Sequence, residues 1–98
     1  MTYDQSWTVR QKVIYREQTI EWLEKKVVEQ EDWLYLYQDY IASPEYHYPL
    51  HDVFDISYKW QPGQIGYLYL HTSSGVRTFY IKNDPSLFIE YFKKGNHL

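Results

Sequence analysis

The sequence predicts a mainly β domain of the α+β kind, in which antiparallel strands are closed by one C-terminal helix. Aromatic residues make up 20% of the chain, with twelve Tyr and four Trp, and such side chains are enriched in strands. Residues 64–95 read as strand, tight turn, strand and helix, with a separate local signal at each join. Residues 7–15 alternate along the chain as a half-buried strand does. Residues 33–41 also alternate, with apolar residues on both faces, so this strand is expected to be covered on both sides or to lie centrally in the sheet.

Length and composition indicate one soluble domain over residues 1–98, with an ordered part of about 5–94. The chain has no Cys, which excludes disulfides, thiolate chemistry and cysteine-based zinc sites and fits a reducing cytoplasm. Neither a secretory signal nor an apolar run of roughly 20 residues is present. The formal charge of −3 argues against nucleic acid as a partner, since a basic face would be needed.

Residues 7–15 are predicted as a half-buried strand, and residues 17–32 have two readings. A helix capped by Thr19 fits their Glu and Lys content and the spacing of Ile20, Leu23 and Val27. The alternative is two strands, 19–23 and 27–29, joined by a turn at 24–26. Strands are favoured because the next segment alternates strictly.

That segment, 33–41, is predicted as one strand, with Leu34 and Leu36 on one face and Trp33, Tyr35 and Tyr37 on the other. Residues 46–50 are expected to be extended, since a residue before Pro is pushed to the β region. Residues 51–60 form the next predicted strand. Its expected core residues are Val53, Phe54 and Ile56.

Residues 61–64 form a turn with Pro62-Gly63 at its centre, and a hairpin follows over residues 65–82. In that hairpin Leu68 and Leu70, rather than Tyr67 and Tyr69, are predicted to face the core. A helix over about 85–94 is capped by Asp84 and begins at Pro85. One broad apolar face is predicted for this helix, formed by Leu87, Phe88, Ile89, Tyr91 and Phe92.

Residues 48–58, reading YPLHDVFDISY, are similar to a segment of small bacterial pleckstrin-homology-like (PH-like) domain proteins. The glycine-bearing hairpin and the Asp84-Pro85 helix start with Phe88-Ile89 extend the resemblance over about 33–94. The resemblance implies an antiparallel PH-like β-barrel or half-barrel of about six to seven strands, closed by one C-terminal α-helix. It implies binding or scaffolding and brings no catalytic residue.

His47, His51 and Asp52 are the candidates for a small enzyme or metal site. Pro49 argues against a helix that would bring both imidazoles to one face. On a strand the two would lie about 13 Å apart, too far for one ion. The histidines are therefore expected to be exposed in a loop, and we predict no catalytic residue, metal site or cofactor.

Basic residues near the N-terminus suggest a second alternative, a membrane surface or lipid headgroup as partner. Phosphate recognition needs cations held close together. Here they alternate with acids, and residues 17–32 hold six acidic and two basic residues, a net charge of −4. Such a field repels a phosphate headgroup, so this alternative is less favoured.

The tyrosines are the most distinctive feature, because too many are present for all of them to be core. Interfaces are enriched in Tyr and Trp, although cross-strand aromatic pairs can also simply stabilise a sheet. The sequence therefore predicts a non-enzymatic interaction or scaffold module that binds a protein, a peptide or another copy of itself. The candidate interaction surface is formed by Tyr35, Tyr37, Tyr58, Trp60, Tyr67 and Tyr69.

Overall fold

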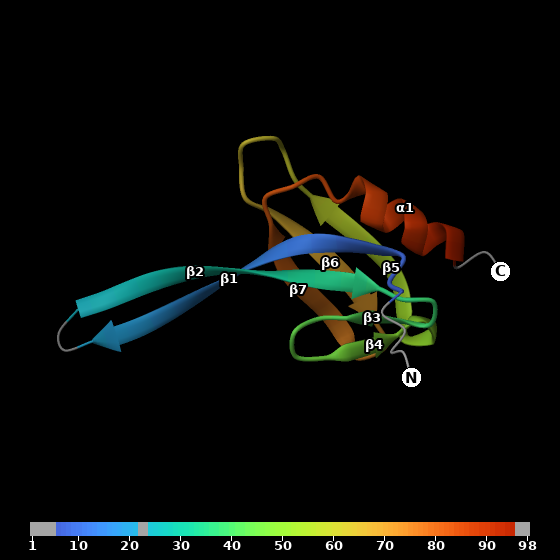
Figure 1. Ribbon diagram of the computed structural model, residues 1–98, viewed down its shortest axis with the longest axis horizontal. Helices are drawn as coiled ribbons and strands as arrows, with labels where there is room; N and C mark the ends of the chain where they lie inside the picture. The colour runs from blue at the N-terminus through green and yellow to red at the C-terminus, as the bar shows by residue number, and fades with distance from the viewer. Residues whose placement is uncertain (1–5, 22–23, 96–98) are drawn as a thin grey trace.

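The computed structural model describes residues 6–21 and 24–95, and for residues 16–21 and 24–28 it describes the backbone only. Within these residues, seven strands precede a single C-terminal helix, and a short 3-10 turn, η1, joins the fourth strand to the fifth (Figure 1). The elements are β1 Val9–Glu21, β2 Glu24–Leu36, β3 Tyr40–Ala42, β4 His47–Pro49, η1 Leu50–Asp52, β5 Val53–Lys59, β6 Gly66–Thr72, β7 Gly75–Ile81 and α1 Ser86–Gly95.

All seven strands belong to one antiparallel sheet in the order β4-β3-β2-β1-β7-β6-β5. The pairing of Ile14 with Tyr80 joins the N-terminal strands to the C-terminal ones. Among the described residues the edge strands β4 and β5 do not pair, so the sheet stays open. Helix α1 contacts β1 and β5 (Figure 1). The predicted antiparallel sheet with one C-terminal helix is confirmed, and because the sheet is open it is consistent with the predicted half-barrel.

The core lies between the sheet and α1. Its side chains come from alternate positions of the strands and from one stripe of the helix. Gln11 is a buried polar residue of β1, and its side-chain amide donates to the backbone oxygens of Lys12 and Asn83 at 3.2 and 3.5 Å. The core comprises Val9, Val13, Leu34, Leu36, Ile41, Val53, Ile56, Leu68, Leu70, Phe79, Ile81, Phe88, Ile89 and Phe92.

The strand reading of residues 17–32 is confirmed, but its turn was predicted in the wrong place. The β1–β2 register runs without a shift from Val9 opposite Leu36 to Glu21 opposite Glu24. Because the register is unbroken, residues 24–26 belong to β2 and do not form the predicted turn. Residues 22 and 23, the end of the predicted strand 19–23, lie outside the described residues.

The prediction of one strand over 33–41 is wrong. β2 ends at Leu36, and the Tyr37 N–H donates to the Tyr40 oxygen at 2.8 Å, which reverses the chain into β3. Polar Gln38 and Asp39 occupy the reversal. The predicted faces of Leu34 and Leu36 are confirmed, since both are buried.

Three further residues were wrongly predicted to face the core. Phe54 is 67% exposed because a β-bulge between Val53 and Asp55 shifts the pairing with β6. A bulge sets two residues against one and reverses which side chains face inward, so Val53 and Ile56 are buried and Phe54 is not. On α1, Leu87 and Tyr91 are 58% and 38% exposed, since only a narrower stripe reaches the sheet.

The C-terminal hairpin and the helix start follow the prediction. Leu68 and Leu70 are buried, and Gly75 takes a φ of 116° after a two-residue turn. At the start of the helix, the Ser86 hydroxyl and N–H donate to Asp84. These two hydrogen bonds, that of the hydroxyl first, lower the pKa of the Asp84 carboxyl.

Candidate interaction surface

A continuous series of rings lies on the side of β1–β4 that faces away from the core, and we call it the aromatic band. Because side chains alternate along a strand, the burial of Leu34 and Leu36 turns Trp33 and Tyr35 outward. The reversal after Leu36 then adds residues from β3 and β4. The band consists of Trp7, Trp33, Tyr35, Tyr37, Tyr40 and His47.

Five of the six rings of the band are in contact in series, and Trp33 is linked to them through the Arg10 guanidinium. The centroids of Trp7 and Tyr35 lie 5.8 Å apart, and those of Tyr35 and Tyr37 lie 6.3 Å apart. Tyr40 stacks on Tyr37 at 4.6 Å and on His47 at 4.8 Å. These spacings fall in the range where aromatic pairs attract one another, so each ring holds the orientation of the next.

Two cations border the band. The Arg10 guanidinium lies 3.9 Å from the ring centroid of Trp33 and 5.3 Å from that of Trp7, close enough for cation–π attraction. Lys12 approaches Trp33 at 5.4 Å and forms an ion pair with Glu31 at 3.4 Å. Among the described residues, no carboxylate forms an ion pair with Arg10.

A second group of rings, the β6–β7 cluster, lies on the same face of the sheet. The ring centroid of Tyr67 lies 6.1 Å from that of Tyr69 and 5.5 Å from that of Tyr80. The ring centroids of Tyr69 and His71 lie 6.5 Å apart. The Nε2 atom of His71 is hydrogen-bonded to the Ser57 hydroxyl at 2.7 Å. The β1–β7 pairing separates this cluster from the aromatic band.

The six residues of the predicted surface fall in four places. Tyr35 and Tyr37 join the aromatic band, and Tyr67 and Tyr69 join the β6–β7 cluster. Tyr58 lines a groove of about 380 Å³ against α1. Trp60 packs on the core, where its indole N–H is buried and has no hydrogen-bond partner among the described residues. The predicted set is therefore not one surface.

Four members of the band were missed by the sequence prediction. They are Trp7, Trp33, Tyr40 and His47. The alternation of 33–37 placed Trp33 beside Tyr35, and that signal was sufficient to include it. Tyr40 and His47 enter only through the β2–β3–β4 pairing, which no local pattern indicates.

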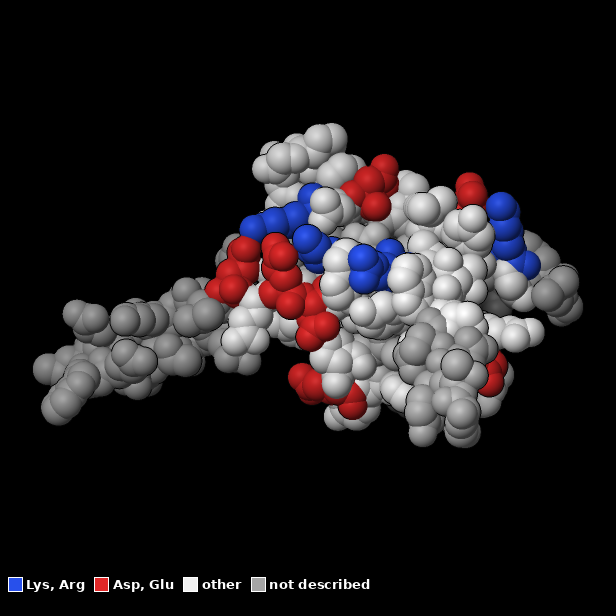
Figure 2. Space-filling view, in the orientation of Figure 1, with Lys and Arg blue, Asp and Glu red and all other residues white. Residues whose placement is uncertain are grey.

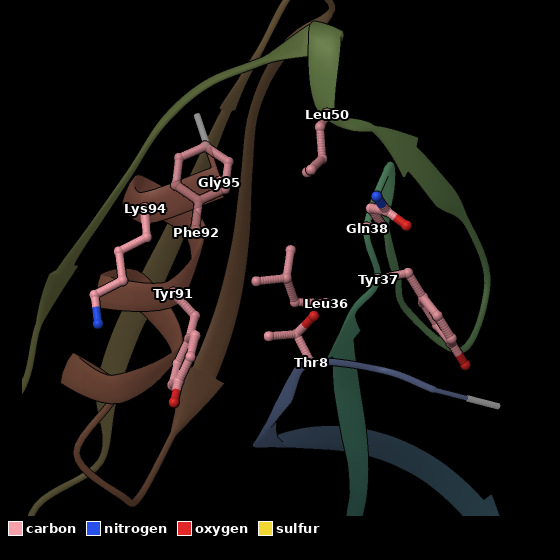
Figure 3. Close-up of a pocket in the computed structure, with 9 residues that line it drawn as sticks. All are labelled: Thr8, Leu36, Tyr37, Gln38, Leu50, Tyr91, Phe92, Lys94 and Gly95. Atoms are coloured by element: carbon pink, nitrogen blue, oxygen red, sulfur yellow. The ribbon is translucent and has the colours of Figure 1, made fainter. Parts of the chain in front are cut away.

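A separate apolar pocket of about 310 Å³ lies between the end of α1 and the β2–β3 reversal. Figure 3 shows Leu36, Leu50 and Phe92 around this hollow, with Tyr91 and Thr8 below them. Its polar groups are few, and the Lys94 ammonium is paired with Glu90 at 3.6 Å. The pocket offers apolar contact without a set of converging reactive groups.

The histidine candidates do not converge. His51 lies 3.7 Å from Asp52, and both are exposed to solvent to a large extent. His47 and Asp52 line one small pocket of about 200 Å³, but the His47 ring is stacked on Tyr40. Within the described ranges no group of three or more His, Asp or Glu side chains could hold a metal ion.

Over the part of the chain that the structure describes, none of the helices has the length and apolar character to cross a membrane.

Tyr15 has the most perturbed electrostatic environment of the described side chains. It lies in a groove with Glu45, Tyr48 and Arg77. Burial, and to a lesser extent the nearby charges of Asp32, Glu45 and Tyr48, raise the pKa of Tyr15 from 10.0 to about 12. The neutral hydroxyl is therefore the form that the folded protein stabilises.

This shift predicts an alkaline loss of stability. The pKa of Tyr15 is higher in the folded protein than in the unfolded chain, so the neutral hydroxyl stabilises the folded state. Its contribution to the free energy of unfolding is complete below pH 10.0 and is lost as the pH rises through about 12. Tyr15→Phe, which cannot ionise, should lose less stability over that interval than the parent chain in urea unfolding. Tyr46→Phe, at a tyrosine that is 63% exposed, is the control. Equal alkaline slopes for the parent and Tyr15→Phe would contradict the assignment.

Comparison with family models, with curated proteins and with solved structures found no match to this chain. The function must therefore be argued from the surface itself.

Proposed function

We propose that this protein is a non-enzymatic interaction module of the PH-like kind, which binds a protein or peptide partner through the aromatic band. The observation that carries the proposal is the unbroken contact series from Trp7 to His47 with Arg10 at its border. Trp, Tyr and Arg are the residues that dominate binding energy at protein interfaces.

The mutual stacking favours binding for a second reason. A side chain that is free in the unbound protein loses rotamer entropy when a partner immobilises it. In the band, Tyr37 and Tyr40 already restrain each other, and Arg10 is held against Trp33. Less entropy is therefore lost on binding, as in rigid aromatic binding surfaces.

Charge supports a protein partner over a lipid headgroup. Lys12 is paired with Glu31, and Lys82 is paired with Glu29. Figure 2 shows basic and acidic side chains side by side where the body of the molecule meets the β1–β2 hairpin. A phosphate would have to compete with these carboxylates, whereas a partner with one carboxylate for Arg10 and an apolar surface for the rings would not.

Photo-crosslinking in the cells from which the protein comes tests the proposal. A benzophenone amino acid would replace Tyr35 or Tyr40 in the band, or Leu87 on the exposed side of α1. We expect one discrete adduct from the two band positions and none of that mass from the Leu87 position. Equal adducts from all three positions, or none from the band, would contradict the proposal.

A further inference from the structure

A groove lies beside β7, on the face of the sheet opposite to the aromatic band. β1 and β7 pair where Ile14 lies opposite Tyr80. Past this pair, β1 continues into the β1–β2 hairpin, which Figure 1 shows projecting from the body. The β3–β4 hairpin borders the space that opens beside β7, and the groove between them has a volume of about 340 Å³.

Strand alternation sets which side chains reach this groove. Arg77 of β7 lies opposite the buried residue Leu70. Tyr48 of β4 lies opposite the buried residue Ile41. Tyr15 of β1, like Tyr48, packs against the core. These three side chains therefore lie on the core face of the sheet and are separate from the rings of the aromatic band.

Groups of both charges line the groove from different walls. Arg77 belongs to β7, whereas Glu45 belongs to the turn between β3 and β4. Both residues are exposed to solvent. A ligand that contacts both walls therefore needs a cationic group for Glu45 and an anionic group for Arg77.

The wall that carries Glu45 favours a cation. Burial first, and then the charges of Asp32, Glu45 and Tyr48, raise the pKa of Tyr15, so nearby carboxylates make the potential at this hydroxyl negative. The rings of Tyr46 and Tyr48 come from the same hairpin as Glu45, with centroids 6.2 Å apart and planes inclined at 45°. Aromatic rings attract a quaternary ammonium group, which needs no hydrogen-bond acceptor.

The wall that carries Arg77 favours a carboxylate. A guanidinium group presents a planar fork of donors that can bind a carboxylate through two hydrogen bonds. A phosphate dianion would carry a further negative charge into a groove that already contains Glu45, and like charges repel. A single negative charge is therefore the better match for Arg77 in this groove.

We propose that the groove binds a small betaine, a zwitterion with a quaternary ammonium group at one end and a carboxylate at the other. The ammonium group lies against Tyr46 and Tyr48 beside Glu45, and Arg77 binds the carboxylate. The groove volume is at the lower end of the range for small-molecule sites, which suits so small a ligand. The site does not rest on the proposed function of the aromatic band.

Titration of the isotope-labelled full chain with glycine betaine, followed by nuclear magnetic resonance, gives the first test. We expect saturable shifts at the groove residues, with a dissociation constant of about 1 mM or below, which is attainable for a ligand of about eight non-hydrogen atoms. Shifts that do not saturate, or that are centred on the aromatic band, would overturn the proposal.

Two comparison ligands test the two ends of the zwitterion. Choline keeps the quaternary ammonium group but lacks the carboxylate, and glycine keeps the carboxylate but lacks the methyl groups. Each should bind at least about tenfold more weakly than glycine betaine, since each loses one of the two favourable contacts. If either bound as tightly as glycine betaine, the assignment of that end would be wrong and the proposal would be overturned.

Variants at the two exposed charges test which residue binds which end. Arg77→Gln should bind glycine betaine at least about tenfold more weakly, the usual effect of losing a hydrogen bond to a charged group, and should bind choline as the parent chain does. Glu45→Gln should weaken the binding of both ligands. Unchanged betaine binding in either variant, or an equal loss of choline and betaine binding in Arg77→Gln, would overturn the proposal.

Arg10→Gln is the matched control, because it makes the same change of charge on the opposite face of the sheet, at the border of the aromatic band. This variant should bind glycine betaine as tightly as the parent chain. A loss equal to that of Arg77→Gln would show that the net charge of the protein, and not the groove, determines binding, and would overturn the proposal.

Discussion

Phe88→Ala is expected to lower the free energy of unfolding by about 3–5 kcal/mol, the usual range for deleting a buried aromatic side chain. Phe88 is 1% exposed and lies in the core with Phe92 and Ile89 on the stripe of α1 that faces the sheet. A small domain is stable by only about 5–15 kcal/mol, so this variant should unfold at a much lower urea concentration than the parent chain.

Leu87→Ala is the matched control for that experiment. Leu87 is the preceding residue of the same helix and is 58% exposed. Leu and Ala have similar helix propensities, and a substitution at an exposed site away from such features usually changes stability by less than about 0.5 kcal/mol. Equal losses in the two variants would contradict the orientation of α1 on the sheet.

Gly66→Ala is expected to destabilise the protein by about 3 kcal/mol, at the upper end of the range for overpacking. A Cβ at this position would clash with the Lys59 oxygen and would lie 2.8 Å from both Cα and Cβ of Trp60. Most of these atoms are backbone, so neither strand can move aside without disturbing the β5–β6 pairing. Urea unfolding with circular dichroism measures the loss.

Gly95→Ala is the control for the glycine substitution, because a Cβ there meets no atom within 4 Å. At the end of α1, alanine should leave stability unchanged or raise it slightly, given its better helix propensity. If Gly66→Ala proved as stable as Gly95→Ala, the close approach of β6 to Trp60 would be wrong.

The parts of the fold that follow from local signals were predictable. The β6–β7 hairpin is fixed by its alternation and by Gly75, and the start of α1 by Asp84 and Pro85. The features that were missed depend on pairing partners. The bulge at Phe54 and the reversal after Leu36 are set by neighbouring strands. They therefore could not be predicted from the periodicity of a single strand.

The same limit explains the candidate surface. Tyr35 and Tyr37 were predicted because they alternate with buried leucines in one segment. His47 lies ten residues beyond Tyr37 and meets the band only because β3 and β4 fold back on β2. Trp60 was assigned to the surface for its residue type, yet it packs on the core. Residue type alone did not distinguish a ring on the outer face of the sheet from a ring that packs on the core.

The central claim is that the aromatic band is the binding surface. The most direct test is the affinity of the crosslinked partner, measured by calorimetry, for the parent chain, for Trp7→Ala with Tyr35→Ala, and for Tyr67→Ala with Tyr80→Ala. The band variant should bind at least about 30-fold more weakly, as expected for the loss of interface hot spots of 2 kcal/mol or more, while the β6–β7 variant binds like the parent. Unchanged affinity in the band variant, with its fold intact, would contradict the account.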